Sequence, residues 1–471
     1  MSSLQPPEWI EARQYQQEAV RNWLEADGQG IFHMATGTGK TITALLAASE
    51  VANHFDGKFI LVVAVPYQHL VDQWAEDLEE FGVTPVLGYQ SRKNWQPRLE
   101  RELLEFNNGV RDVCVIVTTH RTLSQENARQ TLTRARGRMM LIADEVHHLG
   151  ANQSQNALIE DFHFRLGLSA TPERWYDEEG TIALNAYFDG TVFDYGLEAA
   201  IESGALCEYY YLPHIVELQD DEMQEYMQLT AKIGKLMARQ GSGDELELED
   251  NQSLQTALFK RARLIGTARD KIGLLVDLIK RETDPAHSLV YCSDGSTGLD
   301  DDDGKRHVDA TTRQLRSECG LEVERFTARE DQSERERLLS AFEDGKIEVL
   351  TSIRCLDEGV DVPATRTAYI LASTSNPRQY VQRRGRILRR HPDKKYAIIH
   401  DFITIPDTTR HPEVLSDERY DAERTLIKKE LQRVTTFADA ARNHPDAGVD
   451  GVPTTEGSLQ EVKRRYDLLT A

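Results

Sequence analysis

Short apolar runs alternate with amphipathic stretches from Gln29 to about Gly204. This alternation is typical of a parallel sheet flanked by helices. Strands are predicted at Ile31–His33, Phe59–Val65, Val113–Thr118, Met139–Asp144 and Phe164–Leu168. Helices are predicted at Gln68–Phe81, Gln96–Phe106 and Ser154–Phe162. Residues 1–204 are therefore predicted to form one α/β domain.

A second alternation of the same kind covers residues 271–408, which we predict to be a second α/β domain. It begins with a helix around Leu274–Arg281, and its strands are predicted at Ser288–Tyr291, Glu322–Phe326, Ile347–Thr351, Thr367–Ala372 and Tyr396–Phe402. Residues 205–270 are charged and helical in pattern, apart from Tyr209–Pro213, and are predicted as a helical insert. Packing as part of the second domain remains an alternative for this segment. Residues 409–471 are predicted as a helical C-terminal extension.

The stretch Met34–Thr41 reads Met-Ala-Thr-Gly-Thr-Gly-Lys-Thr and lies between a predicted strand and a helix-like run. Gly37 and Gly39 lack a Cβ atom, so successive backbone N–H groups can converge on phosphate oxygens. Lys40 offers a cation for the β- and γ-phosphates, and the Thr41 hydroxyl suits Mg²⁺. With Thr36 and Thr38 in the same loop, the stretch predicts a site for ATP and Mg²⁺.

A pair of carboxylates, Asp144 and Glu145, follows the strand Met139–Ala143. At the end of a strand parallel to the one before the glycine loop, an acidic side chain can hold the water shell of Mg²⁺. The neighbouring carboxylate can activate a water molecule against the γ-phosphate. We therefore predict Asp144 as a metal ligand and Glu145 as the general base.

The charge is strongly acidic, with a formal net charge of −23 and a pI near 5.1. A global charge says little about a single cleft, so it does not exclude a nucleic acid as partner. Of the 55 basic residues 15 are lysine and 40 are arginine. A lysine-poor acidic surface suits a salty cytoplasm, where screening makes high charge tolerable. An ordinary acidic protein of a high-GC genome is the equally weighted alternative.

The five cysteines are scattered without a Cys-x-x-Cys pair, which predicts reduced thiols rather than metal ligands or disulfides. The apolar runs are too short to span a membrane, and the N-terminus has neither a basic start nor an apolar segment of the signal-peptide kind. We therefore expect a cytoplasmic protein.

From residue 9 to residue 405 the chain resembles superfamily 2 helicases of the DExH kind, whose motifs occur here in the family's order. The matching motifs are Arg13 with Gln14-Tyr15-Gln16, the glycine loop, Val65-Pro66, Thr118-Thr119, Asp144-Glu145-Val146-His147, Ser169-Ala170-Thr171-Pro172, Thr351-Ser352 through Gly359-Val360-Asp361, and Gln382-Arg383-Arg384-Gly385-Arg386-Ile387-Leu388-Arg389. The resemblance implies two RecA-like P-loop domains that close on one ATP.

Roles for individual residues follow from this resemblance. It implies that Gln16 hydrogen-bonds the adenine edge and that Arg13 packs on the face of the base. Arg386 and Arg389 are implied to be arginine fingers, which stabilise the charge of the phosphoryl-transfer transition state. The remaining implied roles are the γ-phosphate contact of Gln382, the nucleotide contacts of Gly359 and Asp361, and the coupling of hydrolysis to movement by His147, Ser169 and Thr171.

Nucleic-acid contacts are expected across the carboxyl ends of the strands in both domains. Hydroxyl groups and arginines there can hold phosphates without reading sequence. The candidates are Pro66, Thr118, Thr119, Arg121, Thr351, Ser352 and Arg354. A more weakly supported candidate is the basic loop Arg134–Arg138, which a solvated turn explains better.

The stretches Asp144–His148 and Gly167–Arg174 look more like the branch of XPB-like helicases and restriction-enzyme motor subunits than like the RNA DEAD-box branch. That branch mostly acts on double-stranded DNA, which predicts an ATP-dependent DNA helicase or translocase in DNA repair or in phage defence. Nuclease activity would require a partner protein. An RNA-directed helicase and a nucleic-acid-binding scaffold subunit that uses ATP as a conformational switch remain as alternatives.

Overall fold

The computed structural model describes residues 4–55, 58–151, 154–171, 177–240, 252–293, 306–327, 330–353, 362–372, 377–407, 415–443 and 456–468. The chain divides into two compact units, Met1–Ala205 and Leu206–Ala471. Each unit is built around a parallel sheet, so the predicted pair of RecA-like α/β domains is confirmed.

The first unit contains a seven-stranded sheet with the strand order β3-β4-β2-β5-β6-β1-β7. Its strands are β1 (Gln29–Met34), β2 (Phe59–Val65), β3 (Val86–Gly88), β4 (Val113–Thr119), β5 (Met139–Ala143), β6 (Phe164–Ser169) and β7 (Thr191–Tyr195). Its helices are α1 (Gln14–Glu25), α2 (Lys40–His54), α3 (Gln68–Glu80), α4 (Arg92–Asn107), α5 (His120–Leu123), α6 (Glu126–Leu132), α7 (Glu178–Phe188) and α8 (Leu197–Glu202), with short 3₁₀ turns η1 (Val146–Gly150) and η2 (Gln155–Ala157).

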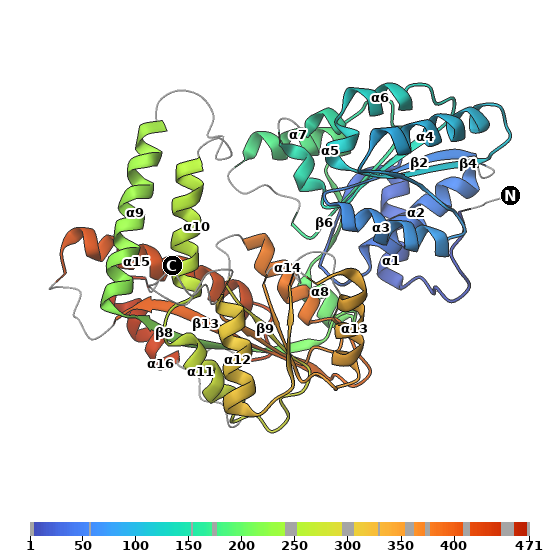
Figure 1. Ribbon diagram of the computed structural model, residues 1–471. Helices are drawn as coiled ribbons and strands as arrows, with labels where there is room; N and C mark the ends of the chain where they lie inside the picture. Colours follow the sequence, from blue (N-terminus) through green and yellow to red (C-terminus); the bar gives the residue numbers. More distant parts are fainter. Residues whose placement is uncertain are drawn as a thin grey trace. The chain divides into compact units, whose positions relative to one another are not determined.

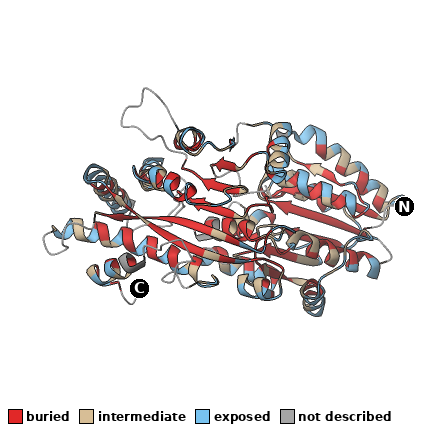
Figure 2. Ribbon diagram, turned by 90° about the horizontal axis from the view of Figure 1, so that it is seen from below, coloured by how far each residue is buried: buried red, intermediate tan, exposed pale blue. Residues whose placement is uncertain are grey.

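The central strands of this sheet are apolar on both faces, because helices cover both faces. Every residue of β2, β4 and β5 is buried. In Figure 1, α1, α2 and α3 lie on one side of the sheet and α4, α5 and α6 on the other. Figure 2 shows the strands buried along most of their length while the outer faces of the helices are exposed. A continuous apolar run is the expected signature of such a doubly covered strand.

The second unit contains a six-stranded parallel sheet with the order β10-β11-β9-β12-β13-β8. Its strands are β8 (Glu208–Leu218), β9 (Ser288–Tyr291), β10 (Val323–Phe326), β11 (Val349–Ser352), β12 (Thr367–Ile370) and β13 (Tyr396–Pro406). Its helices are α9 (Asp220–Gln240), α10 (Gln252–Gly266), α11 (Lys271–Ile279), α12 (His307–Cys319), α13 (Gln332–Glu343), α14 (Pro377–Ile387), α15 (Asp417–Ala438) and α16 (Glu456–Arg465).

The segment predicted as a helical insert begins with strand β8, which pairs with β13 along its whole length. The sequence pattern had set only Tyr209–Pro213 apart from the helical character, whereas the strand continues to Leu218. Helices α9 and α10 follow and pack against each other around Ile233, Leu254 and Ala257 (Figure 1). This segment lies within the second compact unit, because its first element is a strand of the second sheet.

The predicted helix Ser154–Phe162 is wrong, because only the short turn η2 forms there. The N–H groups of Ala157 and Leu158 bond to carbonyls three residues back, and that of Ile159 bonds to the carbonyl two residues back, rather than four residues back as in an α-helix. Tyr187 Oη donates to the Ile159 carbonyl at 2.5 Å, and Arg165 Nη2 donates to the Glu160 carbonyl at 3.0 Å. These two bonds connect the segment to α7 and β6.

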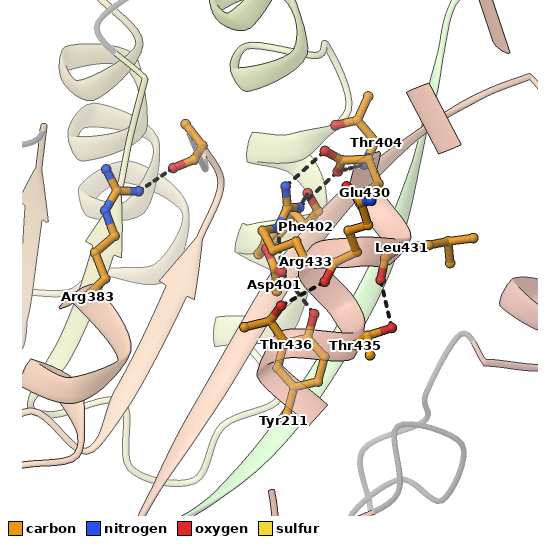
Figure 3. Close-up of polar contacts among 12 residues, drawn as sticks. Tyr211, Arg383, Asp401, Phe402, Thr404, Glu430, Leu431, Arg433, Thr435 and Thr436 are labelled. Atoms are coloured by element: carbon orange, nitrogen blue, oxygen red, sulfur yellow. Dashed lines mark hydrogen bonds and ion pairs between the residues drawn. The ribbon is translucent and has the colours of Figure 1, made fainter. Parts of the chain in front are cut away.

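Helix α15, in the segment predicted as a C-terminal extension, is joined to the second sheet by buried charges. Arg433 of α15 donates to Asp401 of β13 and to Glu430, while Tyr211 of β8 donates to the same Asp401 (Figure 3). All four side chains are buried. Helix α15 therefore contributes to the interior of the second unit rather than lying on its surface.

Candidate active site

The glycine loop lies between β1 and α2, at the carboxyl end of β1. Gly37 and Gly39 have φ angles of 89° and 81°, a left-handed conformation that residues with a Cβ rarely adopt. A Cβ on Gly39 would also approach Gln16 Nε2 to 3.2 Å. Gly39 is the N-cap of α2 and offers no side-chain acceptor to the first turn, which suits an anion at that helix end.

Several hydrogen bonds hold this loop in shape. Thr38 Oγ1 donates to the Ala35 carbonyl at 2.7 Å, and Tyr15 Oη donates to the Thr38 carbonyl at 2.7 Å. Lys40 Nζ lies 3.2 Å from the Met34 carbonyl. Among the described residues the buried Thr36 Oγ1 has no hydrogen-bond partner in the chain. A buried hydroxyl without a partner is costly, and a phosphate oxygen would satisfy it.

Gln16 of α1 packs directly on this loop. It is buried, its Oε1 accepts from the Arg13 N–H at 2.9 Å, and its Nε2 donates to Thr43 Oγ1 at 3.2 Å. The neighbouring Tyr15 ring stacks on Tyr195 with 4.1 Å between the ring centroids. The structure thus brings the predicted base-reading residue to the glycine loop, while its contact with adenine stays a prediction.

Asp144 lies at the carboxyl end of β5 with both carboxylate oxygens bonded. Trp74 Nε1 donates to Oδ2 at 3.0 Å, and the Glu145 N–H donates to Oδ1 at 2.9 Å. Burial raises the pKa of the Asp144 carboxyl, while the Trp74 bond, the Lys40 charge and the Glu145 N–H counteract the rise. Lys40 follows β1 and Asp144 follows β5, so both lie at the carboxyl edge of the same parallel sheet, and their joint binding of ATP and Mg²⁺ stays a prediction.

Glu145 starts a chain of contacts that leads to the end of β6. Its backbone is left-handed, with φ 44° and ψ 53°, a strained conformation for a residue with a side chain. Its Oε2 lies 3.5 Å from His147 Nδ1, which lies 3.2 Å from Ser169 Oγ. Ser169 Oγ in turn accepts from the Thr171 N–H at 3.1 Å. The structure thus brings together the general-base candidate and the three coupling candidates.

In the second unit, α14 presents two sets of polar side chains. Arg383 donates to the Ala372 carbonyl at 2.8 Å, and Arg384 donates to the Thr436 carbonyl of α15. Both guanidinium groups are buried. Gln382 and Arg386, one helical turn apart, are only partly buried. The helix therefore uses Arg383 and Arg384 for packing and leaves the predicted catalytic positions nearer to the surface.

Arg389 follows the end of α14 and is partly buried. Burial lowers the pKa of its guanidinium to about 10, so the side chain stays charged at neutral pH. Contact of the Arg389 and Arg386 side chains with the γ-phosphate of ATP stays a prediction. Gly359, Asp361 and Arg354 lie outside the described residues.

The hydroxyl groups predicted to bind nucleic acid differ from one another in exposure. Thr118 is buried and donates to the Gly88 carbonyl at 2.6 Å, and Thr351 is buried with its Oγ1 2.6 Å from Thr312 Oγ1. Ser352 is buried, and Thr119 caps α5 by accepting from the Thr122 N–H. Arg121 is exposed and Pro66 is partly exposed, and the arginines of the weaker loop candidate Arg134–Arg138 are exposed as well. Phosphate contacts by these residues stay predictions.

Comparison with known proteins agrees with this geometry. The family described as "Type III restriction enzyme, res subunit" matches residues 9–174, and the "Helicase conserved C-terminal domain" matches residues 270–391. The two matches cover the glycine loop, the carboxylates at β5 and the arginines of α14. The chain belongs to the superfamily 2 ATP-dependent helicases. Within them it falls in the branch of XPB-like helicases and restriction-enzyme motor subunits.

Two curated relatives of this superfamily 2 chain are archaeal. The "DNA 3'-5' translocase XPB2" of Sulfurisphaera tokodaii is 26% identical over 410 residues, which are 84% of this chain and 82% of the relative. A Halobacterium salinarum protein provisionally named as the DNA 3'-5' helicase Rad25 is 25% identical, over 81% of this chain and 52% of its own length. The chain thus spans about half of that second relative.

Among solved structures, the "ATP-dependent Type ISP restriction-modification enzyme LlaBIII bound to DNA" matches 98% of this superfamily 2 chain with a TM-score of 0.62. The match covers 32% of that larger chain at 16% identity. At this identity the likeness is one of fold.

Several residues at this helicase site carry no sequence signal that singles them out. Trp74 is an ordinary buried position of α3, and only the packing of α3 against the sheet brings its indole to Asp144. His120 lies beside the Ala64 carbonyl, which also accepts the Asp144 N–H, and its ring centroid is 6.3 Å from that of His148. The two consecutive histidines after Asp144-Glu145-Val146 draw attention to His148 in the sequence. They do not indicate that His120 is its neighbour in the fold.

Three further findings concern the cysteines, the potential metal ligands and the helices of the described residues. Of the described cysteines, Cys114, Cys207 and Cys292 are buried free thiols and Cys319 is a partly buried one. In the parts of the chain that the structure describes, no three His, Cys, Asp or Glu side chains are grouped so as to hold a metal ion. No described helix has both the length and the apolar character that a membrane span requires.

Proposed function

We propose that this protein is an ATP- and Mg²⁺-dependent motor that translocates on, or unwinds, double-stranded DNA. The observation that carries the proposal is the placement of the Lys40 loop after β1 and of Asp144 after β5, at the carboxyl edge of one parallel sheet. The orphaned hydroxyl of Thr36 and the left-handed glycines fit a triphosphate in that loop. The DNA in the proposal comes from the printed names of the relatives.

Each part of ATP hydrolysis is assigned to particular residues of this chain. Lys40 and the loop N–H groups bind and orient the phosphates, while Thr41 and Asp144 would hold Mg²⁺ through oxygen atoms. When bound there, the ion would neutralise part of the phosphate charge. Glu145 accepts a proton from the attacking water, and His147 holds that carboxylate in place through the contact at 3.5 Å.

Movement follows when the two units alternately close and open. Arg386 and Arg389 stabilise the transferring phosphoryl group only in the closed state. Ser169 and Thr171 are linked to Glu145 through His147. They couple ATP hydrolysis to the binding of the nucleic-acid strand. The names of the relatives specify 3′-to-5′ movement, and we propose the same direction here.

The decisive experiment compares the ATPase rate of the purified protein with duplex DNA, single-stranded DNA and RNA over a salt series. We expect stimulation by DNA that weakens as ionic strength rises, because phosphate contacts release counterions. Strongest stimulation by RNA would favour an RNA-directed helicase instead. ATP binding without stimulation by any nucleic acid, and without strand displacement, would favour the scaffold subunit.

A DNA motor of this kind serves in repair or in defence against phage. The two roles differ in the proteins that accompany the motor. A nuclease or methyltransferase that co-purifies with the tagged chain would support defence, while co-purifying repair proteins would support repair.

A further inference from the structure

Three strand ends of the first unit meet at one backbone carbonyl. The Ala64 carbonyl, near the end of β2, accepts the Asp144 N–H at 2.8 Å and lies 3.2 Å from His120 Nε2. Because a carbonyl oxygen only accepts, Nε2 of His120 must carry the proton. One acceptor on β2 is therefore shared by His120, which follows β4, and by Asp144, which follows β5.

His120 is fixed at this junction. Its side chain is 4% exposed, and among the described residues its Nδ1 has no hydrogen-bond partner. His120 directly follows Thr119, and Arg121 follows His120, so the ring stands between two of the proposed nucleic-acid contacts.

His148 connects this junction to the catalytic carboxylate. Its ring centroid lies 6.3 Å from that of His120, 5.8 Å from that of Tyr67 in an edge-to-face arrangement, and 4.3 Å from that of His147. Tyr67 follows Pro66, which is another proposed nucleic-acid contact. His147 in turn contacts Glu145 and Ser169. The His148 ring thus touches segments that follow β2, β4 and β5.

We propose that His120 and His148 are positioning residues that transmit nucleic-acid binding at the ends of β2 and β4 to Glu145. A strand bound across Pro66, Thr119 and Arg121 shifts Tyr67 and His120, and these rings move His148 and His147. The rings are closely packed, so a small shift is passed on rather than absorbed. This inference rests on the proposed function, because it explains how nucleic acid stimulates the ATPase.

The test measures the ratio of DNA-stimulated to basal ATPase rate in the full-length protein. His148→Ala is expected to lower this ratio by about 3- to 30-fold, the range of coupling changes that single residues produce. A purely structural role would lower both rates together and leave the ratio unchanged. His54→Ala, at an exposed histidine of the same unit, is the matched control and should keep the wild-type ratio.

A second pair of variants keeps the test decisive if His148→Ala fails to fold. His120→Gln retains an N–H that can reach the Ala64 carbonyl, whereas His120→Leu fills the space without a donor. We expect the ratio to stay near wild type in His120→Gln and to fall in His120→Leu, with DNA affinity measured separately. Equal ratios in these two variants, or a wild-type ratio in folded His148→Ala, would overturn the inference.

Failure of the proposed function has a different signature. A wild-type protein that no nucleic acid stimulates would reject the DNA-motor proposal itself. A stimulated wild type with equally stimulated variants would reject only the role of the two histidines.

Discussion

Arg433 of α15 donates a hydrogen bond to Asp401 of β13 over 2.9 Å, with both side chains buried. Arg433 also bonds Glu430 through both terminal nitrogens, and Tyr211 donates to Asp401 at 2.9 Å. Opposite charges and hydrogen bonds together make such a buried group tolerable. The network therefore joins helix α15 to the interior of the second unit.

Arg433→Met is expected to lower the free energy of unfolding of the second unit by about 3 to 5 kcal/mol, because it leaves Asp401 and Glu430 buried without their cation. Urea denaturation followed by circular dichroism measures the change. Arg442→Met is the matched control, since Arg442 pairs with Glu208 at the surface and should contribute about 1 kcal/mol or less. Equal effects of the two substitutions would contradict the role assigned to Arg433.

Lys40→Ala is expected to abolish ATP turnover, because the phosphates lose their mobile cation. Glu145→Gln should retain ATP binding and lower kcat by about 10²- to 10⁴-fold, the usual contribution of a general base. Binding is measured with a fluorescent ATP analogue and turnover by phosphate release. Glu50→Gln, on the exposed face of α2, is the control. A Glu145→Gln protein with the wild-type rate would rule out Glu145 as the base.

Arg386→Ala and Arg389→Ala are expected to lower kcat by about 10³-fold with little change in KM, because arginine fingers act on the transition state. The structure offers a contrast in Arg384, whose bond to the Thr436 carbonyl is internal. Arg384→Ala should lower the denaturation midpoint. The exposed Lys395→Ala should change neither quantity. An unchanged kcat in both finger variants would remove them from the mechanism.

The buried pair His214 and His400 should make stability pH-dependent. Their Nε2 and Nδ1 atoms lie 2.8 Å apart, and burial lowers the pKa of His214 to about 4 and that of His400 well below its ordinary value. In the range between the two pKa values, the histidines of the unfolded chain are therefore protonated while those of the folded chain stay neutral. Stability is expected to fall as pH drops from about 6.5 towards 4, by at most about 1.4 kcal/mol per pH unit for each histidine.

Two carboxyl groups near this histidine pair also influence how stability depends on pH. Glu282 lies 3.7 Å from His400 and acts in the opposite direction, because burial raises its pKa, while Asp401 favours the charged form of His214. Comparison with the double variant His214→Gln and His400→Gln cancels their contribution. Its urea midpoint should depend less on pH than that of the wild type. Identical slopes would show that the pair remains protonated or exposed.

The acidic, lysine-poor surface leads us to propose adaptation to a salty cytoplasm. With a net charge of −23, mutual repulsion is screened at high ionic strength, where the Debye length is about 3 Å at 1 M. The basal ATPase rate, measured without DNA, should be retained in molar KCl. Precipitation or loss of that rate under these conditions would favour the ordinary acidic protein.

The sequence predicted the strands of both sheets well where a strand is a contiguous apolar run, as in Phe59–Val65. It failed at Ser154–Phe162, where a short turn with backbone bonds to residues two and three positions back forms instead of an α-helix. The end of β8 was also missed. Its pairing with β13 extends the strand to Leu218, and such a partner cannot be read from the local pattern.

By itself the sequence determined the glycine loop at Met34–Thr41, the carboxylates Asp144 and Glu145, and the helicase family, because these signals lie within short contiguous stretches. Only the tertiary structure decided that Trp74 bonds Asp144 and that His120 shares the Ala64 carbonyl with it. These contacts join residues tens of positions apart. They depend on strand order and on the packing of helices against the sheet, which no local pattern encodes.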